Sequence, residues 1–269
     1  MLTDKIIAFV GGGNMAKALI QGLIDSGLAP GQIRICEPDL GKQQALADQF
    51  GVHPSGQLAV EVAGADVVVL AVKPGVVAPV LTEIAPLLAL ETLIVSIAAG
   101  VPMARLKQGL APAQPVIRVM PNTPALIGAG ISVLYGTSEL AAEKWDLARQ
   151  VMAAVGDVEE VGDESLMDGV TALSGSGPAY VFLMAEALSD GGVLCGLPRP
   201  LADKLAVKTL IGAARLIDES GEHPGVLKNQ VTSPAGTTIA AMAQLERSGV
   251  RAGLIDAVTA AWTRSRELN

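Results

Sequence analysis

The chain has 269 residues, of which half are hydrophobic, and its 27 acidic and 19 basic side chains give a formal net charge of -8 at pH 7. This apolar content is enough for a large core or two modest domains, and it excludes disorder as the main state. The negative charge argues against a nucleic acid or an anionic membrane as a partner, because both attract basic surfaces. Only 3% of the residues are aromatic, which leaves no platform for stacking bases.

Histidine and cysteine are scarce, with two residues of each type. They form no metal-binding or redox motif, so we expect no metal site. The apolar run at 6–10 is too short for a signal peptide, and glycine and proline interrupt the uncharged stretch at 169–185, which makes it a poor membrane span. The sequence therefore predicts a cytoplasmic protein that binds no membrane.

The first 162 residues alternate short apolar runs with helical stretches, a pattern typical of repeated β-α units around a parallel sheet. Strands are predicted at 6–10, 33–36, 67–71, 93–97 and 116–120, and the segments 131–134 and 158–161 could extend the sheet. The run at 67–71 is continuously apolar, as expected for a strand covered on both faces. We therefore predict an α/β domain at 1–162.

From 163 to 269 the sequence contains only helical stretches punctuated by glycine and proline. Helices are predicted at 178–190, 200–220, 237–247 and 250–267, with Gly191 and Gly192 closing the first of them. Residues 179–185 would be apolar on all sides of a helix, which places them in the centre of a domain or under a second subunit. We therefore predict an all-helical domain that forms an interlocked homodimer.

A glycine-rich turn, GGGNMA at 11–16, directly follows the first predicted strand. In a G-x-G-x-x-A pattern, Gly11 makes the tight turn, Gly13 lets the backbone approach a pyrophosphate, and Ala16 lets the helix pack on the strand. The start of the helix offers unpaired N–H groups to the phosphates. A glycine-rich turn without a ligand is the alternative, but the strand–turn–helix context favours a Rossmann-like dinucleotide-binding domain.

Glu37 lies 21 residues after Ala16, at the end of the second predicted strand. An acidic side chain at this position accepts hydrogen bonds from a ribose hydroxyl and repels a 2′-phosphate. Asp39 is a second candidate, and Lys42 is the only cation nearby. These residues favour NADH over NADPH, unless Glu37 is only a solvated strand end.

Further candidates follow other predicted strands, at the carboxyl ends where open sheets bind ligands. Lys73, in the sequence AVKP at 71–74, faces the cofactor in this interpretation and is a surface lysine in the alternative one. The small residues at 98–100 would let a nicotinamide ring approach the backbone. Asn122 lies in a loop that two prolines make rigid, within reach of the same crevice.

The helical half contains one hydroxyl-rich loop, 232–238, with four serine or threonine residues at a predicted helix start. Hydroxyls and unpaired N–H groups at a helix start can bind a carboxylate. Capping by Ser233 or Thr237 is the alternative, but a cap needs one hydroxyl rather than four. We therefore favour a ligand at this loop.

These motifs together resemble the pyrroline-5-carboxylate reductase family. The resemblance covers nearly the whole chain and is most specific in VTALSGSGPAY at 170–180 and HPGVLKNQVTSPAGTTIAAMAQLE at 223–246. It implies a Rossmann domain followed by a helical dimerisation domain, with dimers often assembled into a larger ring. It also implies the reduction of Δ1-pyrroline-5-carboxylate to L-proline, the last step of proline biosynthesis, with NADPH and often also with NADH.

The motifs and the resemblance together assign a set of site residues. The cofactor-binding residues are Val10, Gly11, Gly12, Gly13, Asn14, Met15, Ala16, Glu37, Ala71, Val72, Lys73, Pro74, Ala98, Ala99 and Asn122. The substrate-binding residues are Ser233, Gly236, Thr237, Thr238 and Ser176. Glu164 matches an acidic position near the ring nitrogen of the substrate in the family, so Thr238 and Glu164 are the expected catalytic residues.

Some positions depart from the pattern of the family. Gly56 and Gln57 stand where Asn is common, and Glu37 replaces small or basic residues, which together argue against a strong preference for NADPH. Ala235 and Gly75 stand where Gly and Gln are common, and we expect neither to abolish activity.

Reduction of a cyclic imine makes modest demands on a protein. A protonated imine is already electrophilic, so the chain mainly has to position two rings. Thr238 would hydrogen-bond the nitrogen or the carboxylate, and Glu164 would stabilise the iminium charge.

One alternative function is that of a hydroxyacid dehydrogenase of the 6-phosphogluconate-dehydrogenase type. The absence of lysine from 179–190 argues against it. Another is a dinucleotide-sensing protein without turnover, which would be expected to lose the loop 232–238.

Overall fold

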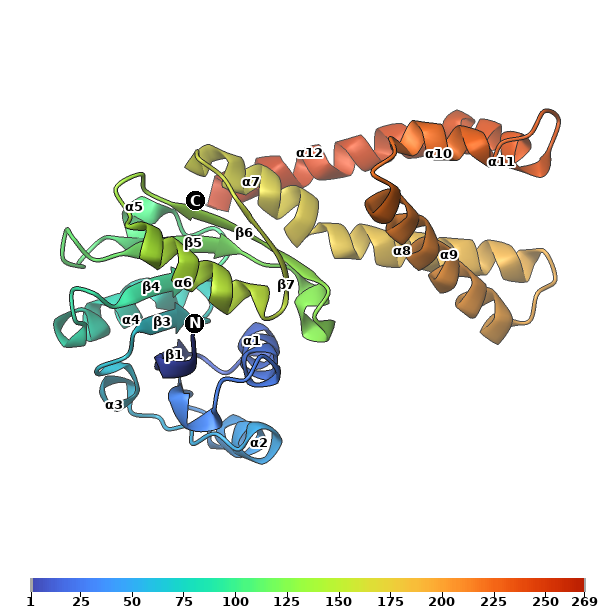
Figure 1. Cartoon of the computed structure of the whole chain (residues 1–269). Coiled ribbons are helices and arrows are strands. Elements are labelled where there is room, and N and C mark those ends of the chain that lie inside the picture. The colour runs from blue at the N-terminus through green and yellow to red at the C-terminus, as the bar shows by residue number, and fades with distance from the viewer. Residues whose placement is uncertain (1, 269) are drawn as a thin grey trace. The chain divides into compact units, whose positions relative to one another are not determined.

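The computed structural model describes residues 2–268, which form two compact units (Figure 1). One unit comprises the residues up to Ser176 together with those from Ala261 onward, and the other is Gly177–Ala260. The sheet of the first unit ends before residue 162, but the short helical segments that follow it still belong to this unit. The domain boundary between residues 162 and 163 stays a prediction.

The first unit is built on a seven-stranded sheet with the order β2-β1-β3-β4-β5-β6-β7. Its strands are β1 (Ile7–Val10), β2 (Ile33–Cys36), β3 (Val67–Leu70), β4 (Leu93–Ser96), β5 (Val116–Met120), β6 (Gly130–Gly136) and β7 (Gly156–Glu160). All five predicted strands are confirmed and pair in parallel, and the two segments that could extend the sheet form β6 and β7. The carboxyl ends of these five strands therefore lie at one edge of the sheet.

The sheet changes direction at β6, which is antiparallel to β5. The sequence pattern did not predict this reversal. Only residues 121–129 join the two strands, whereas a parallel crossover needs a dozen or more residues. β7 runs parallel to β6 after the longer connection that contains α6 (Ala142–Ala153).

Helices cover both faces of the sheet and bury two hydrophobic clusters. One cluster contains side chains of α1 (Asn14–Asp25), α2 (Leu40–Phe50) and α6, and the other contains side chains of α3 (Leu58–Val62), α4 (Pro74–Ile84) and α5 (Met103–Leu106). In β3, Val67 and Val69 belong to the first cluster, and Val68 and Leu70 to the second. All four are buried, which confirms the prediction of a strand covered on both faces.

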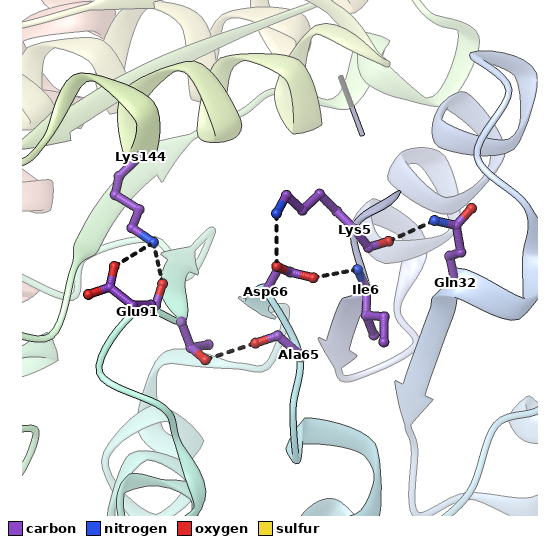
Figure 2. Close-up of polar contacts among 8 residues, drawn as sticks. Lys5, Ile6, Gln32, Ala65, Asp66, Glu91 and Lys144 are labelled. Carbon is purple, nitrogen blue, oxygen red and sulfur yellow. Dashed lines mark hydrogen bonds and ion pairs between the residues drawn. The ribbon is translucent and has the colours of Figure 1, made fainter. Parts of the chain in front are cut away.

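The amino ends of the strands are joined by polar contacts (Figure 2). Asp66, just before β3, accepts hydrogen bonds from Ile6 N at 2.9 Å and from Lys5 Nζ at 3.1 Å. Gln32 Nε2 donates to the carbonyl of Lys5 at 3.1 Å, which links the start of β2 to that of β1. The hydrogen bond and the charge of Asp66 raise the pKa of Lys5. These contacts align the strands from the edge opposite to the carboxyl ends.

Short helical segments complete the first unit. They are the 3₁₀ helices η1 (Leu2–Asp4), η2 (Pro30–Gln32), η3 (Ala85–Leu87), η4 (Thr123–Ile127) and η5 (Glu164–Leu166), then α7 (Met167–Val170) and the π-helical segment η6 (Thr171–Gly175). Gly175 packs closely on the end of β5, because a Cβ at this glycine would lie 2.3 Å from Cε of Met120. The segment η6 therefore packs against the Met120 side chain at the end of β5.

The second unit is helical, as predicted. It contains α8 (Gly177–Leu194), α9 (Arg199–Ser220), α10 (Pro224–Gln230), α11 (Thr237–Arg247) and most of α12 (Val250–Leu268). The sequence pattern missed α10, a helix of seven residues. His223 Nδ1 caps it by accepting a hydrogen bond from Gly225 N at 3.0 Å.

The prediction that Gly191 and Gly192 close their helix is wrong. α8 continues to Leu194, and the left-handed residue after it is Gly196, with φ +92°. A Cβ at Gly192 would lie 3.1 Å from the Cβ of Ala202 in α9. The glycine therefore allows two helices to approach each other rather than ending one of them.

The apolar side chains of α8 are not central to their unit. Phe182 is 66% exposed, and Val181 and Leu183 are exposed as well. Within Gly177–Ala260, only Ala202 and Ala206 are buried hydrophobic residues. Of the two places that the sequence left open for this helix, the centre of a domain is excluded, and cover by a second subunit remains.

No helix among residues 2–268 combines the length and the apolar character that a membrane crossing requires.

Candidate cofactor and substrate sites

Three segments predicted at the cofactor lie at one edge of the sheet. In the parallel register, Val10 of β1 is level with Leu70 of β3, which is level with Ser96 of β4. Ala71 N donates to the carbonyl of Val10 at 2.9 Å, and Ile97 N donates to that of Leu70 at 3.2 Å. The glycine-rich turn, the AVKP sequence and the loop that contains Ala98 and Ala99 therefore begin side by side.

The glycine-rich turn has the geometry that a dinucleotide requires. Gly11 has φ +102°, and a Cβ there would lie 2.6 Å from the carbonyl oxygen of Ala71, so only glycine fits. A Cβ at Gly13 would have no atom within 4 Å, which leaves its outer side open to a phosphate. No side chain caps α1 at Gly13, and Ala16 is buried against the sheet. The residues present therefore fit a pyrophosphate at this turn.

Glu37 is buried at this turn, with 5% of its surface exposed. Its Oε2 accepts a hydrogen bond from Gly12 N at 2.9 Å, and its Oε1 accepts one from Asp39 N at 3.1 Å. A Cβ at Gly12 would lie 2.6 Å from Cδ1 of Leu46 and 3.3 Å from Glu37 Oε2, so the glycine makes room for the carboxylate. Glu37 is therefore a fixed group beside the turn and not a solvated strand end.

Sequence reasoning missed the residues that support Glu37 from outside. Ser55 forms an isolated parallel bridge with Cys36, and its carbonyl accepts a hydrogen bond from Glu37 N at 2.9 Å. The Ser55 hydroxyl donates to Oε1 of the buried Glu61 at 2.6 Å.

Burial, helped by the charges of Glu61, Glu83 and Glu37, raises the pKa of the Cys36 thiol to about 11. The thiol therefore stays neutral near pH 7.

We expect Glu37→Ser to raise the ratio of kcat/KM with NADPH to that with NADH. The change removes an acceptor for a ribose hydroxyl together with a charge that repels a 2′-phosphate. A hydrogen bond to a charged group is worth roughly 1.5–3 kcal/mol, so the ratio should change by about 10- to 100-fold. Steady-state titrations with both cofactors measure it.

Glu37→Gln is the matched control, because its amide oxygen can still accept from Gly12 N, while the charge and the second acceptor, which receives Asp39 N, are lost. A rise with both variants assigns the preference to the charge, and a rise with serine alone assigns it to the ribose hydrogen bond. An unchanged ratio in both would show that Glu37 only supports the turn.

Two other predicted cofactor residues have clear structural surroundings. Lys73 is exposed and immediately precedes α4, where Pro74 takes the first helical position. Asn122 Oδ1 accepts a hydrogen bond from Ile131 N at 3.0 Å, which ties the loop after β5 to β6. The oxygen of Asn122 is thus engaged within the fold, and the contact of both residues with a cofactor stays a prediction.

Glu164 is engaged with two other segments of the first unit. Its Oε1 accepts hydrogen bonds from Arg118 Nη1 at 2.8 Å and from Met103 N at 2.6 Å. The side chain of Arg118 is only 5% exposed. Sequence reasoning missed this partner, although the single arginine in the otherwise apolar strand VIRVM predicts that a carboxylate pairs with it.

The hydroxyl-rich loop lies in the second unit and leads into α11. Gly236 is the N-cap residue, and no side chain caps the helix, so the capping alternative for Ser233 and Thr237 is not found. Gly236 N donates to the carbonyl of Ser233 at 3.1 Å, and a Cβ at Gly236 would lie 2.4 Å from the Ser233 hydroxyl. The loop therefore folds back, with the Ser233 hydroxyl close to the helix start. Thr237 and Thr238 are the first two residues of α11.

Ala235 is the one residue other than glycine with positive φ in the described chain, at +56°. We expect Ala235→Gly to leave the free energy of unfolding unchanged or to raise it by at most about 1 kcal/mol. The backbone strain that the change relieves costs slightly more free energy than the extra conformational freedom that glycine gives the unfolded chain. Urea unfolding at fixed protein concentration measures the difference. Ala240→Gly, within α11, is the control and should lose roughly 0.5–1 kcal/mol. Equal losses of unfolding free energy in the two variants would show that the backbone at Ala235 is not strained.

Comparison with known proteins gives matches along both units. A family model described as pyrroline-5-carboxylate reductase dimerisation matches residues 164–268, and one described as NADP oxidoreductase, coenzyme F420-dependent, matches residues 6–100. A pyrroline-5-carboxylate reductase of Synechocystis sp. is 46% identical over 265 residues, which cover 97% of each chain.

Solved structures agree with these matches. A pyrroline-5-carboxylate reductase of Coxiella burnetii is 38% identical and superposes with a TM-score of 0.92 over 98% of each chain. A pyrroline carboxylate reductase of Plasmodium falciparum with NADP bound is 28% identical and has a TM-score of 0.89, covering 99% of this chain and 98% of that one.

Proposed function

The chain belongs to the pyrroline-5-carboxylate reductase family, and on that premise we propose that it reduces Δ1-pyrroline-5-carboxylate to L-proline with NAD(P)H, the last step of proline biosynthesis. The observation that carries the proposal is the full-length match, which runs through both the glycine-rich turn and the loop 232–238. The parts needed for the cofactor and for the substrate are thus both present in one chain.

Bound NAD(P)H supplies the hydride. The turn at 11–13 and the start of α1 would hold the pyrophosphate, and Glu37 would accept a hydrogen bond from the adenosine ribose. The segment 71–74 and the small residues Ala98 and Ala99 line the rest of the cofactor, because they follow neighbouring parallel strands at the same edge.

The start of α11 holds the carboxylate of the substrate. The uncapped helix start offers unpaired N–H groups, with the hydroxyls of Ser233, Thr237 and Thr238 beside them. Thr238 hydrogen-bonds the substrate, donating to the carboxylate or accepting from the protonated ring nitrogen, and Ser176 is a further substrate contact. These groups orient the imine, which is the main task that this chemistry leaves to the protein.

Glu164 is the acidic group assigned to the ring nitrogen. The carboxylate is already paired with Arg118, so the field that it exerts on a nearby iminium is partly cancelled. Its electrostatic role at the substrate is therefore weaker than the sequence alone predicts.

The chain forms a homo-oligomer through its helical region, which the dimerisation model matches. We further propose that the helical domains of two chains interlock in a homodimer, that the homodimers assemble into a larger ring, and that the protein acts in the cytoplasm. Apolar side chains such as Phe182 and Leu183, exposed in the single chain, support a second subunit on α8.

Oxidation of NADH and NADPH by the purified protein tests the proposed function. We expect turnover with Δ1-pyrroline-5-carboxylate and none with a panel of 2- and 3-hydroxyacids assayed in the oxidative direction. α8 contains no lysine to deprotonate an alcohol, which argues against a hydroxyacid dehydrogenase. Turnover of a hydroxyacid alone would overturn the proposal, and cofactor binding without any turnover would indicate a dinucleotide sensor.

A further inference from the structure

Glu164 connects three segments that are far apart in sequence. It begins η5, directly after the sheet, and its Oε1 accepts hydrogen bonds from Arg118 in β5 and from the backbone of Met103 at the start of α5. The partners are 46 and 61 residues away along the chain. One carboxylate oxygen thus fixes the relative positions of a strand and a helix start.

Arg118 places this contact at the cofactor edge of the sheet. In the parallel register it is level with Ser96, the last residue of β4. Its guanidinium is almost fully buried, so the charge needs a carboxylate partner to remain there. Glu164 is the ion-pair partner that the structure gives it.

Met103 connects the same carboxylate to the loop after β4. This loop, 97–102, contains Ala98 and Ala99 and ends where α5 begins. Pro102 is the N-cap residue of α5 and offers no side-chain cap, so Met103 N would lack a partner within the helix. Glu164 supplies that partner. Val101 and Met103 are buried, which anchors the end of the loop to the core.

We propose that Glu164 is a positioning residue for the nicotinamide end of the cofactor, and that it acts through Arg118 and Met103 N on the loop 97–102. The proposal rests on the proposed function only in that a nicotinamide cofactor binds at this edge. The carboxylate holds the loop in the conformation in which Ala98 and Ala99 line the nicotinamide. Its first effect is therefore on cofactor affinity and not on the imine.

The dissociation constants of NADH and NADPH, measured from their fluorescence at 25 °C without any imine, test this role. For Glu164→Ala we expect an increase of about 10-fold or more, because two hydrogen bonds to a charged group are lost. Glu164→Gln keeps an acceptor for Met103 N but removes the charge that pairs with Arg118, so its dissociation constants should rise by less than those of the alanine variant. Arg118→Met should resemble Glu164→Ala, and the double variant should add little to either, since the two residues act as one unit.

Asp163→Asn is the matched control. It removes a negative charge one residue away, where the side chain only caps η5 by accepting from Ser165 N at 2.9 Å. Its cofactor affinity should be unchanged. An equal loss of affinity in Asp163→Asn would overturn the proposal in favour of a general effect of charge.

An unchanged dissociation constant in Glu164→Ala would also overturn it. If kcat then falls equally in the alanine and glutamine variants, the carboxylate acts directly on the ring nitrogen; if only the melting temperature falls, the pair is merely structural. Should the alanine variant not fold, Glu164→Gln decides alone, because a positioning role predicts a raised dissociation constant for the cofactor and a direct role at the imine predicts a loss of kcat with an unchanged dissociation constant. Absence of imine turnover in the parent protein would contradict the proposed function and leave these affinities interpretable.

Discussion

Phe182→Asp is expected to dissociate the oligomer at micromolar protein concentration and to lower the free energy of unfolding by roughly 2–5 kcal/mol, the loss expected for an unpaired charge in a buried interface. In the single chain Phe182 is 66% exposed, where an aspartate would lose little. The large effect therefore arises only if a second subunit covers α8. Light scattering measures the dissociation, and denaturant unfolding at two protein concentrations measures the stability.

The surroundings of Phe182 suggest a sharp control. It lines a groove of about 860 Å³ whose walls come from α8 and α9, with Leu183 and Val207 among the apolar lining residues. Phe182→Leu keeps the position apolar and should preserve the oligomer. Any loss of unfolding free energy in this variant would come from the smaller side-chain volume alone. An active monomer of the parent protein, or full tolerance of the aspartate, would show that α8 is not covered by a second subunit.

The arrangement of the sheet was largely predictable because each strand carries its own local signal. The continuous apolar run at 67–71 predicted a strand buried on both faces, and the structure divides its side chains between two cores. The glycine-rich turn was equally local, because Gly11 and Gly13 have requirements set by their own backbone and immediate neighbours. Signals of this kind need no knowledge of the tertiary structure.

The features that sequence reasoning missed depend on distant partners. Gly192 follows the pattern of a helix end, but it serves the approach of Ala202 on another helix. Glu164 carries no local sign of its partner Arg118, which lies 46 residues earlier. The reversal at β6 follows from the length of one connection and not from any residue pattern within the strand. Tertiary contacts decide the first two features, so periodicity and spacing cannot reveal them, whereas the short connection before β6 can be read from the sequence.

Thr238→Ala is expected to lower kcat/KM for Δ1-pyrroline-5-carboxylate by about 10- to 100-fold, the equivalent of one hydrogen bond to a charged group at roughly 1.5–3 kcal/mol. The affinity for NAD(P)H should be nearly unchanged, since every predicted cofactor segment lies in the first unit. Steady-state kinetics with varied imine, together with cofactor titration, measure both quantities.

The location of Thr238 makes this variant informative. It is the second residue of α11, where alanine is a better helix former than threonine, and its side chain does not cap the helix. A loss of activity therefore cannot come from a weakened helix.

The kinetic parameter that changes shows which part of the substrate the hydroxyl contacts. A rise in KM alone would assign the hydroxyl to the carboxylate, which is bound equally in the ground and transition states. A fall in kcat would assign it to the ring nitrogen, whose bonding changes as the imine becomes an amine. Thr238→Ser keeps the hydroxyl and should retain most of the activity. Full activity of the alanine variant would remove Thr238 from the site and leave Ser233, Thr237 and the N–H groups of the helix start to hold the substrate.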